Sequence, residues 1–151
     1  MNTKQDTFIG REVKYMFFDK KKKEFFKSIY HAFEGKLQDM LINYKGELML
    51  READGMSHES TFKNRYIKIE SIGSQDRNGA EVYNGSLLKD DAGGVHRVEW
   101  HKKTESYHIV KWIGQKHRFN YVQVVSKFYN PETGKLNLDI YGHTLTDKKF
   151  I

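Results

Sequence analysis

The chain has 151 residues, of which 38% are apolar and 14% aromatic, and this is enough apolar surface for a folded core. Twenty-six lysines and arginines against twenty aspartates and glutamates give a net charge of +6, which favours partners of negative charge. Cysteine is absent, which excludes a disulfide framework, a thiolate metal site and a cysteine nucleophile. Because no apolar run is long enough to span a membrane and the first residues lack an apolar signal core, we expect a cytoplasmic protein without membrane contact.

The first predicted element is a helix over about residues 20–34. Asp19 is a typical N-cap for such a helix, and Gly35 is a typical residue to end it. Its apolar side chains recur at three- and four-residue spacing, which is typical of one apolar stripe. The residues of this stripe are Phe25, Phe26, Ile29, Tyr30 and Phe33.

After the predicted helix the pattern changes toward strands. Residues 37–45 keep a helical period, but Lys45-Gly46 is also a typical hairpin turn, so both helix and strand stay open for this segment. From Glu47 onward the period is close to two. The predicted strands are 47–51, 65–72, 80–88, 95–102, 107–113, 119–130 and 135–145. Their connections are too short for crossover helices, so we expect an antiparallel sheet.

The last two predicted strands form a hairpin with one apolar face and one polar face. Pairing Asn130 with Lys135 across the turn sets Tyr129 opposite Leu136. Taken together, the elements predict one α+β domain over residues 1–151. Its N-terminal helix or helix pair packs on a curved antiparallel sheet of five to seven strands, with the apolar stripe of the helix facing the sheet.

Basic residues gather in two segments, and in one of them they alternate with aromatic residues. Lys20 to Lys23 open the predicted helix, where the helix dipole disfavours each exposed cation by roughly 0.3–1 kcal/mol. This unfavourable placement suggests contact with phosphate. Residues 95–118 hold six basic side chains against two acids, together with both tryptophans. Cations that neutralise phosphates and rings that stack on unpaired bases are what single-stranded nucleic acid requires. The predicted phosphate contacts are Lys20, Lys21, Lys22, Lys23, Arg97, Lys102, Lys103, Lys111 and Arg118, and the predicted stacking residues are Trp112 and Tyr141.

Two histidines come together in the hairpin predicted over residues 95–114. With a turn at Thr104-Glu105, His101 faces His108 and Glu99 lies beside them. One imidazole can then take the 2′-OH proton of RNA while the other protonates the leaving oxygen, without a metal. The same set fits a two-histidine, one-carboxylate metal site, although we expect no metal and no cofactor. His143 is a further candidate for this cluster. The remaining histidines are interpreted as surface or capping residues: His31, His58, His96 and His117.

These patterns favour a small basic nucleic-acid-binding protein that prefers RNA or single strands. Duplex DNA is disfavoured because no basic recognition helix is predicted and the aromatic residues lie on strands. One alternative is a metal-independent ribonuclease that uses the histidine pair. The other alternative is an inhibitor, a scaffold or a pocket-forming oligomer, with an acidic protein or a second copy of the chain as its partner. A core of aromatic residues surrounded by solvated lysines has the same composition.

Overall fold

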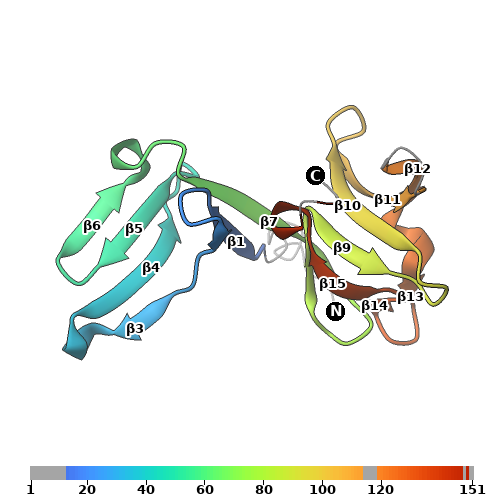
Figure 1. Ribbon diagram of the computed structural model, residues 1–151, viewed down its shortest axis with the longest axis horizontal. Coiled ribbons are helices and arrows are strands. Elements are labelled where there is room, and N and C mark those ends of the chain that lie inside the picture. The colour runs from blue at the N-terminus through green and yellow to red at the C-terminus, as the bar shows by residue number, and fades with distance from the viewer. Residues whose placement is uncertain (1–12, 114–118, 148, 150–151) are drawn as a thin grey trace, which may run out of the picture. The chain divides into compact units, whose positions relative to one another are not determined.

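The computed structural model describes residues 13–113, 119–147 and 149, and these residues form an all-β structure (Figure 1). The predicted α+β class is wrong, because the described residues contain no helix of seven residues or more. The predicted antiparallel pairing is confirmed, but the described strands form four sheets and not one sheet of five to seven strands. Short 3-10 turns occur at η2 (Ala32–Glu34), η3 (Glu59–Thr61), η5 (Val125–Phe128) and η6 (Thr144–Thr146). Within the described ranges no helix has the length and apolar character needed to cross a membrane.

The chain divides into two compact units. The N-terminal unit is Met16–Lys68, and the C-terminal unit is Ile69–Ile151 together with Met1–Tyr15. Two strands of one sheet carry the chain from one unit into the other. This sheet contains, in spatial order, β2 (Glu24–Phe25), β1 (Tyr15–Asp19), β7 (Tyr66–Gln75) and β8 (Glu81–Tyr83). That the chain folds as one domain remains a prediction. The two units are defined by the contacts within each of them, and these contacts do not show whether the units unfold together.

The N-terminal unit is built on a sheet whose four strands lie side by side in chain order (Figure 1). The strands are β3 (Ile29–His31), β4 (Lys36–Ile42), β5 (Leu48–Glu52) and β6 (Gly55–His58). Met40, Leu48 and Leu50 form its buried cluster, since alternate residues of β4 and β5 point to the same face. Five partly buried side chains pack against this cluster: Phe17, Phe26, Ile42, Phe62 and Tyr66.

The predicted helix over residues 20–34 is wrong. Lys20 to Lys23 form the turn between β1 and β2, and the rest of the segment contains β2, β3 and η2. Its apolar residues do not share one face: the ring of Phe25 meets Phe18 edge-on at 5.3 Å, whereas Phe33 is 85% exposed. Aromatic and β-branched side chains fit a pleated surface, and strand pairing avoids the cost of nucleating an isolated helix.

The sequence pattern of residues 37–45 allowed either a helix or a strand, and these residues form a strand and a turn. β4 ends at Ile42, and the side chain of Asn43 then accepts the backbone N–H groups of Lys45 and Glu47 at 3.0 and 2.9 Å. Gly46 has φ +79°, a left-handed conformation that glycine adopts without a steric penalty. Asn43 and Gly46 therefore close the β4–β5 hairpin.

The C-terminal unit holds a five-stranded antiparallel sheet and a short hairpin. In spatial order the sheet contains β12 (Phe119–Val124), β11 (Ser106–Trp112), β10 (Val95–His101), β9 (Ser86–Lys89) and β15 (Asp139–His143). The short hairpin joins β13 (Tyr129–Asn130) to β14 (Lys135–Leu136) and pairs Tyr129 with Leu136, as predicted. The buried core comprises Val82, Leu88, Val98, Ile109, Leu136 and Leu138. Because the described residues contain no α-helix, the predicted packing of an apolar helix stripe on the sheet is wrong as well.

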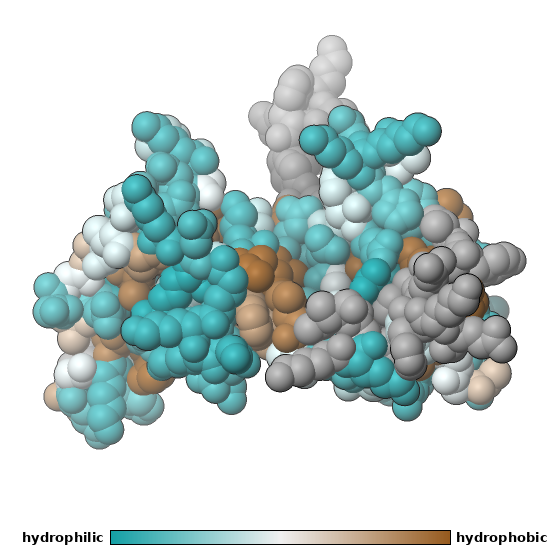
Figure 2. Space-filling model, turned by 45° about the horizontal axis from the view of Figure 1, so that its top comes forward, coloured by the Kyte–Doolittle hydropathy of each residue, from teal (hydrophilic) through white to brown (hydrophobic). Residues whose placement is uncertain are grey.

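The visible surface is mainly hydrophilic, with hydrophobic residues in smaller areas (Figure 2). This agrees with a chain of which 30% is charged. Some aromatic side chains of the N-terminal unit are nevertheless well exposed, including Tyr30, Phe33 and Tyr44. Singly exposed apolar side chains are common on folded proteins and do not by themselves mark an interface.

Candidate functional site

An open hollow in the N-terminal unit is bordered by cations, and we call it the basic hollow. It has a volume of about 580 Å³ and is lined by Lys20, Lys21, Thr61, Phe62, Lys63, Asn64 and Arg65. No carboxylate is among these lining residues. The β1–β2 turn and the 61–65 loop meet here because the backbone N–H of Lys20 donates to the carbonyl oxygen of Arg65 at 2.8 Å. Two predicted phosphate contacts, Lys20 and Lys21, therefore lie beside Lys63, which the sequence analysis did not single out.

An ion pair between a buried carboxylate and a partly exposed guanidinium lies beside the basic hollow. Asp19 is 3% exposed, and Arg65 donates to its two carboxylate oxygens from Nε at 3.1 Å and from Nη2 at 2.9 Å. The backbone N–H groups of Lys21 and Lys22 donate to Oδ1 of the same carboxylate. The hydrogen bond from Arg65 is the largest cause that lowers the pKa of Asp19 below its ordinary value. Because Asp19 balances Arg65, the positive charge of the hollow comes from its exposed lysines.

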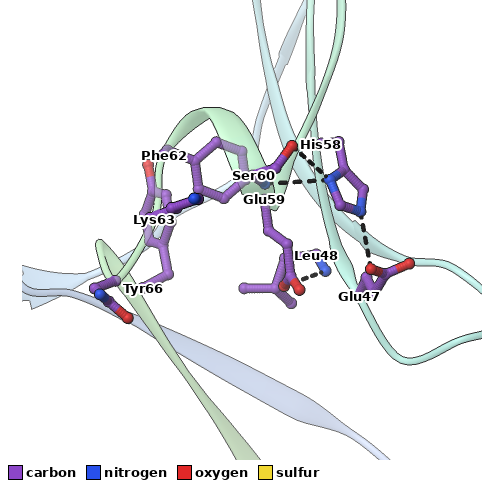
Figure 3. A pocket seen from close by; sticks show the side chains of 9 residues that line it. Glu47, Leu48, His58, Glu59, Ser60, Phe62, Lys63 and Tyr66 are labelled. Carbon is purple, nitrogen blue, oxygen red and sulfur yellow. Dashed lines mark hydrogen bonds and ion pairs between the residues drawn. The ribbon is translucent and has the colours of Figure 1, made fainter.

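A second pocket, of about 450 Å³, adjoins the basic hollow and shares Phe62, Lys63 and Asn64 with it (Figure 3). Its other lining residues are Glu47, Leu48, His58, Glu59, Ser60 and Tyr66. Burial raises the pKa of Tyr66. We call this pocket the Glu–His–Glu pocket, after its three titratable side chains that lie closest together: Glu47, His58 and Glu59.

The three titratable side chains of the Glu–His–Glu pocket converge. Nε2 of His58 lies 3.1 Å from Oε2 of Glu47, and the two groups point toward each other (Figure 3). Glu59 accepts the backbone N–H of Leu48 at 2.9 Å through Oε2. One potential ligand atom from each of the three lies within 4.8 Å of the others. A hydrogen bond from the Asn43 amide, followed by His58, lowers the pKa of Glu47. This donor set can hold a metal ion.

The β5–β6 hairpin brings these side chains together. Glu52 pairs with Gly55 and Met49 with His58, so the residue that precedes β5 lies near the residues that follow β6. His58 also caps the short η3 turn, since its Nδ1 accepts the backbone N–H of Ser60 at 3.2 Å. The sequence pattern did not indicate this site. The Asp54-Gly55 dipeptide is a turn signal, but the turn residues are Ala53 and Asp54, so a two-residue turn at Asp54-Gly55 would set the register wrong by two residues.

In the C-terminal unit the predicted histidine cluster lies on one face of the β10–β11 hairpin. The rings of His101 and His108 stack with their centroids 4.4 Å apart and their planes at 25°. Nε2 of His101 lies 3.2 Å from Oε1 of Glu99. His108 is only 9% exposed, and its Nδ1 is buried without a hydrogen-bond partner among the described residues.

The predicted register of this hairpin is wrong by two residues. His101 pairs with Ser106, and Glu99 pairs with His108, where the sequence analysis paired His101 with His108. The turn contains four residues, 102–105. A slip of two residues preserves the face on which each side chain lies. The two histidines and Glu99 therefore share a face despite the wrong partners.

His143 bonds to backbone atoms of the segments around β15 and the β8–β9 turn. It is 6% exposed, its Nε2 lies 2.7 Å from the carbonyl oxygen of Asn84, and its Nδ1 accepts the backbone N–H of Leu145 at 3.1 Å. Both ring nitrogens therefore bond to nearby backbone. Burial is the main cause that lowers the pKa of His143.

The other predicted nucleic-acid contacts are spread over the C-terminal unit. Nε of Arg97 donates to Oε2 of Glu99 at 2.9 Å, so an acid balances this cation. Tyr141 is 38% exposed, and Nζ of Lys89 lies 4.7 Å from its ring centroid. Lys102, Lys103 and Lys111 are exposed, Trp112 is half-buried at the end of β11, and Arg118 lies outside the described residues. The remaining two, Lys22 and Lys23, are exposed in the β1–β2 turn.

Comparison with known proteins indicates the fold and no activity. No family model and no curated protein matches the chain. The structure is similar to that of protein EF1440 from Enterococcus faecalis, with 14% sequence identity over 92% of this chain and 97% of that chain and a TM-score of 0.54. Protein YopX from Bacillus subtilis matches with 13% identity over 91% and 96% of the two chains and a TM-score of 0.45. The likeness to EF1440 shows a shared fold, and the names of both proteins specify no function.

Proposed function

We propose that the N-terminal unit binds single-stranded nucleic acid, RNA in the first place, through the basic hollow. The observation that supports this is the set of exposed lysines Lys20, Lys21 and Lys63 around a hollow of about 580 Å³ that no carboxylate lines. Lysines that neutralise phosphates release the condensed counterions of the nucleic acid, and this release favours binding. Because the β1–β2 turn is bonded to the 61–65 loop, the lysines of both segments border the same opening.

The basic hollow also offers an aromatic surface. Phe62 lines it, half-buried, and its ring meets Tyr66 edge-on at 5.5 Å. An unpaired base can stack on such a ring whatever its identity, and this contact typically contributes about 1–3 kcal/mol per base. A lysine-bordered hollow with one aromatic wall suits a single strand better than a duplex, whose bases are already stacked.

Binding without cleavage is the form of the function that we favour. The imidazoles of His101 and His108 stack face to face at 4.4 Å, which leaves no room for a phosphate between them. General acid–base cleavage requires each imidazole to reach its own oxygen of the scissile phosphate. Glu99, which lies next to both rings, adds negative charge to that surface.

The test measures fluorescence anisotropy of labelled single-stranded RNA, single-stranded DNA and duplex DNA over a salt series. A variant with Lys20→Gln, Lys21→Gln and Lys63→Gln is compared with the wild-type chain. A control variant carries glutamine at Lys102, Lys103 and Lys111, which are also exposed, so both variants lose the same charge. We expect the first variant to bind RNA about tenfold more weakly or worse, with a salt slope lower by roughly 2, and the control to change much less.

Two results would overturn this proposal. One is the absence of RNA binding by the wild-type chain at low salt. The other is an equal loss of affinity in both triple variants, which would show that net charge and not the basic hollow determines binding. The same samples are run on a denaturing gel with EDTA. If the wild-type chain cleaves RNA and His101→Ala does not, the ribonuclease alternative is correct and the proposal of binding without cleavage is wrong.

A further inference from the structure

We propose that Glu47, His58 and Glu59 form a binding site for a divalent transition-metal ion, with Zn²⁺ as the ion to test. This inference does not depend on nucleic-acid binding, because the donor atoms belong to the Glu–His–Glu pocket and not to the lysines of the basic hollow. Among the described residues, this is the group in which three such side chains offer ligand atoms within 4.8 Å of one another.

The donor atoms have a suitable type and spacing. Imidazole nitrogen and carboxylate oxygen are ordinary Zn²⁺ ligands, with bond lengths of about 2.0–2.2 Å. Two such ligands in a tetrahedral site are roughly 3.3 Å apart by that geometry. Nε2 of His58 and Oε2 of Glu47 are 3.1 Å apart, close to this value. A rotation of the Glu59 carboxylate within the 4.8 Å cluster supplies the third ligand.

Each ligand is already held by a second group. The Asn43 amide donates to Oε1 of Glu47 at 3.1 Å, and the Leu48 backbone N–H donates to Oε2 of Glu59. Nδ1 of His58 lies 2.9 Å from Oγ of Ser60 and accepts the Ser60 backbone N–H, so Nε2 carries the proton in the metal-free chain. When Nε2 binds the ion, Nδ1 carries the proton and donates to the Ser60 hydroxyl in place of that backbone hydrogen bond. Partners of this kind orient ligands and fix the histidine tautomer in known metal sites.

The surroundings leave room for a further ligand. Three protein ligands with an open fourth position are typical of catalytic zinc sites, whereas structural sites are closed by four protein ligands. Here the open side faces a pocket of about 450 Å³ that Lys63 and Asn64 also line. The ammonium group of Lys63 favours an anionic oxygen, such as that of a phosphate, in the fourth position.

The histidine cluster of the C-terminal unit serves this role less well. The two oxygens of Glu99 bond to Arg97 and to His101. His108 is stacked against His101, so their ring planes lie nearly parallel and their nitrogens do not converge on one point between them. Metal binding is therefore expected at the Glu–His–Glu pocket of the N-terminal unit.

Calorimetric titration of the full chain with Zn²⁺ tests this inference, together with the visible absorption of bound Co²⁺. His58→Asn removes Nε2 but keeps a side-chain oxygen that can cap Ser60. Glu47→Gln removes a charged ligand and keeps its shape. His31→Asn, at an exposed histidine of the same unit, is the matched control. We expect one equivalent of Zn²⁺ in the wild-type chain, at least tenfold weaker binding in both site variants and unchanged binding in the control.

Several outcomes would overturn the inference. The inference is wrong if the wild-type chain does not bind one equivalent of Zn²⁺ or if His58→Asn binds Zn²⁺ as tightly as the wild-type chain. It is also wrong if His101→Asn loses the ion instead. Thermal unfolding without metal shows whether each variant folds. If His58→Asn does not fold, the Zn²⁺ affinity of the conservative variant Glu47→Gln tests the inference instead. A variant with Lys20→Gln and Lys21→Gln, which lie in the basic hollow and do not line the Glu–His–Glu pocket, should keep its Zn²⁺ affinity. Failure of the metal site and failure of nucleic-acid binding are therefore separate results.

Discussion

At the scale of single residues, the Asp19 carboxylate organises the basic hollow. It receives two hydrogen bonds from Arg65 and two from the backbone of the lysine turn while it is 3% exposed. The sequence pattern predicts a helix N-cap at Asp19. The residue does accept the N–H groups that follow it, as an N-cap would, but the chain then turns back as a strand.

We expect Asp19→Asn to destabilise the chain at about pH 7 by roughly 2 kcal/mol, because it removes the charged partner of an Arg65 guanidinium that is still partly solvated. The pKa of folded Asp19 lies below the ordinary value of 3.8, so its stabilising contribution is present above that value. It is lost as the pH falls through the folded-state pKa. Urea unfolding should therefore show a large difference between variant and wild type at about pH 7 and a smaller one at about pH 3.

The control for this prediction is Asp54→Asn, at an exposed aspartate in the turn between β5 and β6. Its stability should equal that of the wild-type chain at both pH values, because surface substitutions away from specific contacts typically change stability by less than about 0.5 kcal/mol. A wild-type stability for Asp19→Asn at neutral pH would contradict the role given to this ion pair.

At the scale of elements, the β8–β9 turn depends on close approach to His143. Gly85 has φ +85°, and a Cβ atom built on it would lie 2.7 Å from Cε1 of the buried His143 ring. Gly93 has a similar φ of +81°, but nothing lies within 4 Å of its Cβ position. An alanine at either position adopts a strained left-handed backbone, but only an alanine at Gly85 also overlaps a neighbouring side chain.

Gly93→Ala should cost about 1 kcal/mol, from the left-handed backbone alone, whereas Gly85→Ala should cost roughly 2–4 kcal/mol because the overlap is added. In a His143→Ala background the cost of Gly85→Ala should fall to that of Gly93→Ala. Denaturant unfolding of the four chains in this double-mutant cycle measures the coupling. Strictly additive effects of the Gly85 and His143 changes would exclude the overlap as the cause.

Hairpins also show what the sequence pattern can and cannot determine about an element. Alternation of apolar and polar residues correctly assigned Glu99, His101 and His108 to one face of β10 and β11. It did not determine their pairing, because a slip of two residues leaves the faces unchanged. Turn chemistry was decisive at the β13–β14 hairpin, where the predicted pairing of Asn130 with Lys135 is confirmed.

At the scale of the whole molecule, each unit has its own buried cluster. The cluster of the C-terminal unit includes Leu88, Ile109 and Leu138, which have no exposed surface, whereas the cluster of the N-terminal unit is limited to Met40, Leu48 and Leu50. A unit with a smaller buried core opens at a lower free energy. We therefore expect amides of β4 and β5 to exchange hydrogen faster than amides of β9, β10 and β11.

Leu138→Ala, at a fully buried side chain, tests whether the units unfold together. It should lower the opening free energy of amides in β9 to β11 by about 2–5 kcal/mol, because it leaves a cavity in the C-terminal core. Hydrogen exchange followed by mass spectrometry should show a much smaller change in β4 and β5. An equal loss in both units would instead demonstrate one cooperative domain, as the length and composition predict.

The sequence by itself determined the antiparallel pairing, the approximate position of most strands after Glu47 and the faces of β10 and β11, because a period of two depends only on local geometry. It missed β6, and it joined β8 to β9, which the turn at 84–85 separates. The tertiary structure decided the rest. Packing of single aromatic residues against strand partners outweighed the helical spacing of residues 20–34. Hairpin closure brought Glu47 to His58, and backbone pairing brought Lys20 to Lys63. Such contacts join residues distant in the chain, and local periodicity carries no information about them.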